Sequence, residues 1–237
     1  KPNGDTLPAV PELPRQEVVT GDKEIDALLW LRQVIGTGDP VRIAQAKEAA
    51  GRITTPPGEL EQRYSKWLVA KAGHMLAGLG SIGFANLDGL AERAITRRAN
   101  EAEAIGRFGG ALWDDTQAEA FCQEVLRGLE RDSWQLPPEQ VAGRFKAVPE
   151  LMPHTLSDCL HELAYWNELY RLRNACDTQG YYENSIEAHA RDWFVFGLLA
   201  ELRPRNREEA RATLRYLMGS ERDDAPEAER ILDNLIG

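Results

Sequence analysis

Helix-start signals recur along this chain at intervals of about one helix length, and they constrain its fold more than any other feature. Asp39-Pro40 places a capping carboxylate before a first-turn proline. Thr116-x-x-Glu119 and Thr155-x-x-Asp158 have the spacing of a capping box, in which two side chains bond the free backbone amides of the first turn. Strict apolar–polar alternation, the pattern of a half-buried strand, extends nowhere over more than a few residues. The sequence therefore predicts an all-α protein.

Apolar stripes between these signals predict about ten helices in a compact, bundle-like arrangement. The clearest stripe runs from Leu60 to Met75, on one face of a helix that we expect to end at Gly78. The segment 193–199 is apolar on nearly all sides, which predicts the most deeply buried helix. The expected helices cover residues 22–36, 40–51, 56–78, 88–108, 116–129, a short piece within 133–154, 155–176, 182–203, 207–218 and 226–236.

Proline positions suggest how the chain is divided. Pro8, Pro11 and Pro14 recur at every third residue, the repeat of a polyproline II helix, so residues 1–20 are expected to form an extended arm. Prolines also interrupt residues 133–154, which we expect to connect a helical region over 21–132 to a second one over 155–237. One continuous domain over 21–237 is the alternative.

Composition bounds the class of protein. A net charge of -10 argues against a general nucleic-acid binder, because binding to phosphates needs a basic face. The longest apolar stretch, 193–200, is far shorter than the ~20 residues of a membrane-spanning helix. Three widely spaced cysteines predict reduced thiols in a cytoplasmic protein. The excess of arginine (22) over lysine (6) is typical of a GC-rich genome and favours a bacterial or phage origin.

Three glycines match the spacing of a dinucleotide-binding loop. In Gly78-x-Gly80-x-x-Gly83 the match is to GxGxxG, which binds a pyrophosphate only between a strand and a helix N-terminus. Here a helix is expected before the glycines, so we interpret them as a connector between helices. We expect no bound cofactor.

One alternative function is that of a metal-dependent hydrolase. Asp158 and His161 are three residues apart, and Asp158 and Glu162 are four apart, so the three side chains share one face of a helix. Carboxylates and an imidazole at that spacing can hold one metal ion. The simpler interpretation is that these are solvated capping and surface residues.

A second alternative is a nucleic-acid-associated protein. Arg93, Arg97 and Arg98 begin the main basic concentration of the chain, on a helix that continues to Arg107. Glutamates alternate with these arginines, and mixed signs at helical spacing are more typical of a solvated face with pairs inside the helix.

Our leading hypothesis is a non-catalytic helical protein that acts by protein–protein contact, as a regulator, inhibitor or adaptor. Tryptophan, tyrosine and arginine contribute most to interface energy, and they gather near one expected helix corner. Residues 119–237 contain 22 acidic and 14 basic side chains, a field that attracts a basic partner. A homodimer is a further expectation. The candidate partner-binding residues are Trp166, Tyr170, Arg171, Arg173 and Tyr181.

Overall fold

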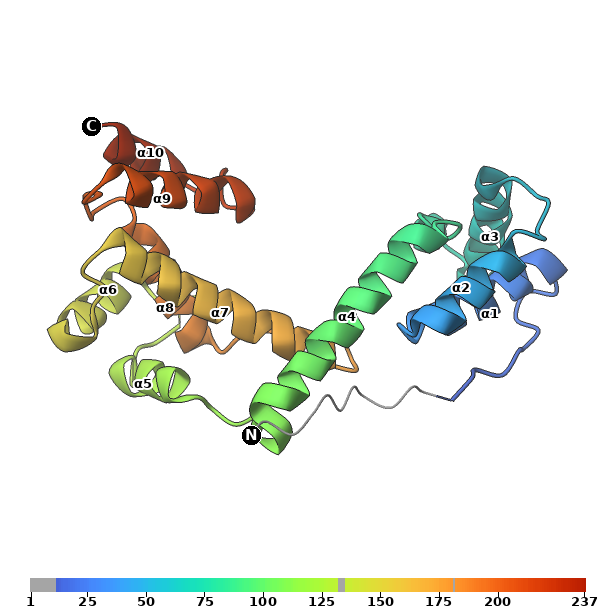
Figure 1. Cartoon of the computed structure of the whole chain (residues 1–237), viewed down its shortest axis with the longest axis horizontal. Coiled ribbons are helices and arrows are strands. Elements are labelled where there is room, and N and C mark those ends of the chain that lie inside the picture. The colour runs from blue at the N-terminus through green and yellow to red at the C-terminus, as the bar shows by residue number, and fades with distance from the viewer. Residues whose placement is uncertain (1–11, 132–134, 181) are drawn as a thin grey trace. The chain divides into compact units, whose positions relative to one another are not determined.

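A computed structural model describes residues 12–131, 135–180 and 182–237, and within these ranges the protein is all-α, as predicted. Ten α-helices and three short 3-10 helices are present in this part of the chain, and no strand is (Figure 1). The chain divides into two compact units, Lys1–Gly109 and Gly110–Gly237.

The first unit is built around a helical hairpin. α1 (Lys23–Gly36) packs against α2 (Pro40–Ala50), and both contact α4 (Leu87–Phe108). α3 (Pro57–Ala72) packs on α1 and is followed by the 3-10 helix η1 (Met75–Ser81). The buried apolar side chains that these elements share include Ile25, Leu28, Leu31, Ile35, Ile43, Leu60 and Phe84.

The predicted caps Asp22 and Asp39 are confirmed, whereas α3 begins without a side-chain cap. Asp22 accepts hydrogen bonds from the amides of Glu24 and Ile25, and Asp39 accepts one from Arg42. Between them, Gly38 lets the turn approach α4, because a Cβ atom there would lie 2.6 Å from the carbonyl oxygen of Ala94. Its φ of +68° is also one that glycine adopts without strain.

The prediction that the third helix continues to Gly78 is wrong. α3 ends at Ala72, since Gly73 takes the left-handed conformation (φ 75°) and its amide donates to the carbonyl of Val69. Met75 therefore lies in η1 and is exposed, not in the buried stripe. No strand precedes Gly78 in the described chain, which agrees with a connector and not with a dinucleotide-binding loop.

The described part of the predicted arm lies against α1. The indole nitrogen of Trp30 donates to the carbonyl oxygen of Pro14 at 2.8 Å. The carboxylate of Asp26 accepts from the backbone amides of Thr20 and Gly21. Residues 14–21 are thus tied to their own unit. Pro8 and Pro11, for which an extended arm was also predicted, lie outside the described residues.

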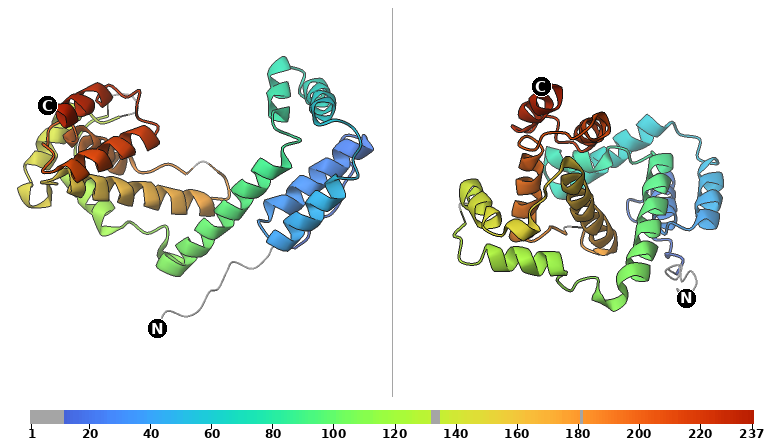
Figure 2. Two further views of the ribbon diagram at one scale, coloured as in Figure 1. Left: turned by 45° about the horizontal axis from the view of Figure 1, so that its top comes forward. Right: turned by 60° about the vertical axis from the view of Figure 1, so that its left-hand side comes forward.

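The second unit surrounds α8 (Ile186–Leu198), which packs against α5 (Gln117–Val125), α6 (Pro138–Lys146) and α7 (Leu156–Cys176). α9 (Arg207–Gly219) lies on α7 and contacts α10 (Ala228–Ile236), as the two further views show (Figure 2). The shared core includes Leu156, Leu163, Val195, Phe196, Leu199 and Ile231.

The two units meet in sequence at Gly109–Gly110, whereas the predicted division lies in the proline-rich segment 133–154. The described part of that segment belongs to the second unit. It forms α6 and the 3-10 helix η3 (Pro149–Leu151), and α6 contacts α8 through the buried side chains of Val141 and Phe145.

A buried ion pair joins α7 to the start of α5. The guanidinium of Arg173 donates to both carboxylate oxygens of Glu119, and also to the carbonyl oxygens of Leu112 (2.8 Å) and Asp114 (2.9 Å) and to the hydroxyl of Tyr182 (2.9 Å). Burial alone would raise the pKa of Glu119, but hydrogen bonds from Arg173 and Thr116 hold this pKa below its usual value. Both partners are therefore charged and bonded inside the unit.

Removing one partner of this pair should destabilise the second unit strongly. We expect Arg173→Met to lower the free energy of unfolding by about 3–5 kcal/mol, because the Glu119 carboxylate would stay buried without its counter-ion. Arg171→Met is the matched control. Arg171 is half-exposed and pairs with Glu168, so its loss should cost within about 0.5 kcal/mol. Chemical denaturation followed by circular dichroism measures both, and equal effects would contradict the prediction.

The same pair predicts a direction of pH dependence. The pKa of Glu119 is lower in the folded protein, so its contribution is complete above the ordinary carboxyl range and is lost as pH falls through the folded pKa. The difference in unfolding free energy between wild type and Glu119→Gln should therefore be largest near neutral pH and shrink below about pH 4. Urea titrations from pH 7 to pH 3 test this, and a difference that grows on acidification would refute it.

Candidate functional site

One side of α8 faces a groove on the second unit. Ile186, His189, Ala190, Trp193 and Phe194 follow at i, i+3, i+4, i+7 and i+8, so they lie on a single helical face. The face begins where α8 does, because the hydroxyl of Ser185 caps the helix by accepting from the amide of Ala188. These five side chains form one wall of what we call the α8 groove.

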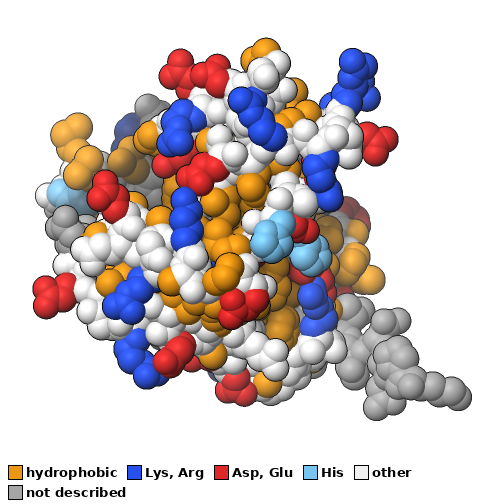
Figure 3. All heavy atoms as spheres, turned by 90° about the vertical axis from the view of Figure 1, so that its left-hand side faces the viewer, with side chains coloured by type: hydrophobic (Ala, Val, Ile, Leu, Met, Phe, Trp, Pro, Cys, Tyr) orange, Lys and Arg blue, Asp and Glu red, His pale blue; other side chains and the backbone are white. Residues whose placement is uncertain are grey.

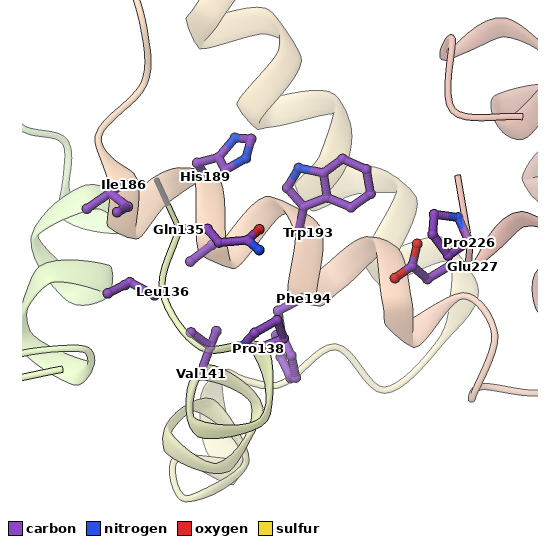
Figure 4. A pocket seen from close by; sticks show the side chains of 11 residues that line it. Gln135, Leu136, Pro138, Val141, Ile186, His189, Trp193, Phe194, Pro226 and Glu227 are labelled. Atoms are coloured by element: carbon purple, nitrogen blue, oxygen red, sulfur yellow. The ribbon is translucent and has the colours of Figure 1, made fainter. Parts of the chain in front are cut away.

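The opposite wall comes from α6 and the residues before it. Leu136, Pro138 and Val141 face α8 across the groove, and the side chain of Gln135 lies between the two walls (Figure 4). Pro138 is at the first turn of α6, where a missing amide hydrogen costs no hydrogen bond. Pro226 and Glu227, just before α10, close one end. The groove has a volume of about 290 Å³, and its lining is mostly apolar.

Trp193 is the largest side chain of the groove and is 36 % exposed. The guanidinium of Arg222 lies 4.9 Å from its ring centroid, and the ring of Phe196 meets it edge-on at 5.6 Å. The imidazole of His189 lies 6.2 Å away, one helical turn earlier. Contacts with Arg222 and Phe196 thus hold the indole in place while part of it faces solvent.

Arg222 is itself fixed by Asp192. It pairs with the Asp192 carboxylate, which lies inside the second unit, and its guanidinium also lies 5.1 Å from the ring of Phe196. Burial raises the pKa of Asp192, while the positive charge of Arg222 opposes that rise. This arrangement preorganises the groove wall around Trp193.

Glu227 gives the groove a polar end. Its Oε2 atom is buried and accepts no hydrogen bond from the described residues. The carboxylate points back toward the groove in Figure 4. A buried acceptor without a partner costs free energy, which a donor from a ligand would recover. The groove can therefore take an apolar group that has a hydrogen-bond donor or a positive charge beside it.

The predicted metal ligands lie together, but both carboxylates are already engaged. Asp158, His161 and Glu162 line a second hollow beside Leu151 and Tyr165. The Asp158 carboxylate accepts from the amides of His154 and Thr155 as half of the predicted capping box. A hydrogen bond with the Thr155 side chain, followed by these backbone bonds, lowers the pKa of Asp158.

Glu162 is the counter-ion of a buried arginine. Arg191 donates to it through Nε (2.6 Å) and Nη2 (2.8 Å), and the guanidinium lies 4.7 Å from the ring centroid of Phe145. Across the described residues, no three histidine, cysteine or acidic side chains are close enough to hold a metal ion. The helical spacing thus reflects a cap and an ion pair.

The predicted partner-binding residues do not share one surface. Trp166 and Arg173 are only 2 % and 4 % exposed, because the indole lies on the side of α7 that faces α5 and the guanidinium binds Glu119. Tyr170 and Arg171 are partly exposed on the same helix. Tyr181 lies outside the described residues.

The predicted basic helix is α4, and its residues Arg97 and Arg98 bond within their own unit. The Nε atom of Arg97 donates to Glu101 at 3.0 Å, and the Nη1 atom of Arg98 donates to the carbonyl oxygen of Thr37. Arg93 lies on the same helix, near the backbone of Gly89. The mixed-charge interpretation describes Arg97 and its neighbours well.

Sequence reasoning missed the α8 groove. The segment 193–199 was expected to be buried all round, and Val195, Phe196 and Leu199 are. Trp193 is not, because α6 leaves this face of α8 partly open. The spacing of the five α8 residues was a usable signal, but nothing local indicated that residues 135–141 form the opposite wall.

On the side of the molecule drawn in Figure 3, hydrophobic side chains (orange) are exposed in a strip between acidic and basic groups. Among the described residues, no helix is both long enough and apolar enough to span a bilayer.

In comparisons with known proteins, no family model, no curated protein and no solved structure matches the chain.

The cysteines give a direct test of the interior of this unit. Burial raises the pKa of the Cys122 and Cys159 thiols to about 12, so almost none of either is thiolate at pH 8. Cys176 is only half-buried. We expect iodoacetamide at pH 8 to modify Cys176 first in the native protein, and all three thiols in urea. Mass spectrometry of peptides locates the label, and rapid native labelling of Cys122 or Cys159 would contradict this packing.

Proposed function

We propose that this protein is a non-catalytic binding protein, which acts by protein–protein contact through the α8 groove. The observation that carries the proposal is Trp193, a large aromatic side chain that is held in place by Arg222 and left partly exposed in an apolar groove. Preorganised aromatic side chains in concave apolar sites are typical anchors of protein recognition.

The charge of the groove favours a basic partner. Glu227 supplies an acceptor at one end, and the exposed residues Asp223 and Asp224 precede it in sequence. Residues 119–237 as a whole carry an excess of acidic side chains. A fitting segment would insert an apolar side chain beside Trp193 and place a lysine or arginine near Glu227. The role of such contact would be regulatory, inhibitory or that of an adaptor.

A pair of synthetic peptides tests this proposal. One is a short amphipathic helix of leucine and lysine, and the other has glutamate in place of every lysine. We expect fluorescence anisotropy to show that the dye-labelled basic peptide binds the protein and that the acidic one does not. Glu227→Lys should weaken binding about tenfold or more, since it removes a charge-assisted hydrogen bond and adds repulsion.

Matched variants keep the test specific. Ala190→Arg fills the groove and should abolish binding, whereas Ala120→Arg, on an exposed part of α5, should not. Glu229→Lys makes the same charge change as Glu227→Lys on the exposed side of α10 and should have little effect. Equal binding of both peptides, or equal loss in Ala190→Arg and Ala120→Arg, would refute the proposal.

A further inference from the structure

The first unit presents an exposed apolar projection. Met75, Leu76, Leu79 and Ile82 are 87 %, 73 %, 61 % and 77 % exposed, and all four come from η1 and the residue that follows it. Large apolar side chains clustered in this way mark a surface that something else covers. We refer to these four residues as the η1 knob.

Backbone packing holds the knob in shape. At Gly78 the chain lies directly on α3, where a Cβ atom would come within 2.6 Å of Ser65 Oγ and 3.2 Å of Val69 Cγ2. The hydroxyl of Ser81 donates to the carbonyl oxygen of Gly78 at 2.8 Å. Because the glycine side of η1 contacts α3, the large side chains of the knob are left facing solvent.

The knob belongs to a stretch of sequence without acidic residues. From residue 62 to residue 87 the chain contains no aspartate or glutamate, although 38 of its 237 residues are acidic. Lys66, Lys71 and His74 are exposed in this stretch, and the Lys71 ammonium lies 4.6 Å from the ring centroid of Trp67. The knob therefore combines apolar side chains with nearby positive charge.

These are the properties that the α8 groove requires of a ligand. The groove is apolar, of side-chain dimensions, and acidic at the end where Glu227 lacks a donor. We propose that the η1 knob of one copy of this protein binds in the α8 groove of a second copy. This inference rests on the proposed function and names the partner of that same site.

Such a contact is head-to-tail, because the two surfaces differ. Each copy in a complex would keep one knob or one groove free, so assembly continues until a ring closes or a chain of copies forms. Association should rise with protein concentration. It should weaken with added salt, which screens the attraction between the lysines and the acidic groove.

Sedimentation velocity of the full chain tests the proposal. The knob variant is Leu76→Asp with Leu79→Asp, at side chains too exposed to support the fold. The groove variants are Ala190→Arg and Glu227→Lys, so that one remains if the other fails to fold by circular dichroism. We expect the wild type to grow in mass with concentration, and each variant alone to keep the mass of a single chain.

Mixing the knob variant with a groove variant distinguishes this contact from others. The groove variant still has an intact knob, and the knob variant still has an intact groove, so an equimolar mixture should form a 1:1 complex. A mixture that stays dissociated, although the wild type associates, would overturn the proposal in favour of knob-to-knob contact. A wild type of single-chain mass at all concentrations would also overturn it, and if that protein pelleted with vesicles containing phosphatidylserine, the knob would belong to a lipid surface.

The peptide assay, repeated with the knob variant, separates this inference from the proposed function. Peptide binding by a wild type that does not self-associate would refute only the second copy as the partner. If the protein neither binds the peptide nor self-associates, the groove is refuted as a binding site.

Discussion

The second unit depends on arginine–carboxylate pairs that link its helices. Arg173 connects α7 to Glu119 of α5, Arg191 connects α8 to Glu162 of α7, and Arg222 connects the segment before α10 to Asp192 of α8. Burying a charge is costly unless it is paired and hydrogen-bonded, so each guanidinium strongly favours one arrangement of its helices over the alternatives. Apolar packing around Leu163, Val195 and Phe196 supplies most of the stabilisation but is far less directional.

α8 serves both the core and the candidate site. Val195 and Phe196 point into the interior, Asp192 holds Arg222, and Trp193 projects between them into the groove. The geometry of the groove is thus coupled to the packing of the unit. A ligand would meet a surface whose shape is already set, which lowers the entropy cost of binding.

Local signals predicted much of this fold because they act within a few residues. The capping residues Asp22, Asp39, Thr116 and Thr155 begin helices where expected, since each satisfies backbone amides of its own first turn.

Helical spacing was a poor guide to the role of a side chain whose partner lies far away in the sequence. Asp158 and Glu162 resembled metal ligands, but Arg191, on another helix, neutralises Glu162. Trp166 and Arg173 resembled interface residues, but their burial depends on α5 and the loop before it. The α8 groove was missed for the same reason, because Val141 and Trp193 are far apart in sequence.

Glu119 takes part both in a contact within its own helical turn and in a contact with a distant helix. One of its carboxylate oxygens accepts from the amide of Thr116, completing the capping box, and the same carboxylate binds Arg173. The first turn of α5 therefore cannot fray without uncovering a charge on α7. Helix ends are ordinarily where backbone amides exchange with solvent fastest, through small local openings. Here that opening requires the rupture of a tertiary contact, so the start of α5 should exchange its amides together with the C-terminal end of α7, as one cooperative unit.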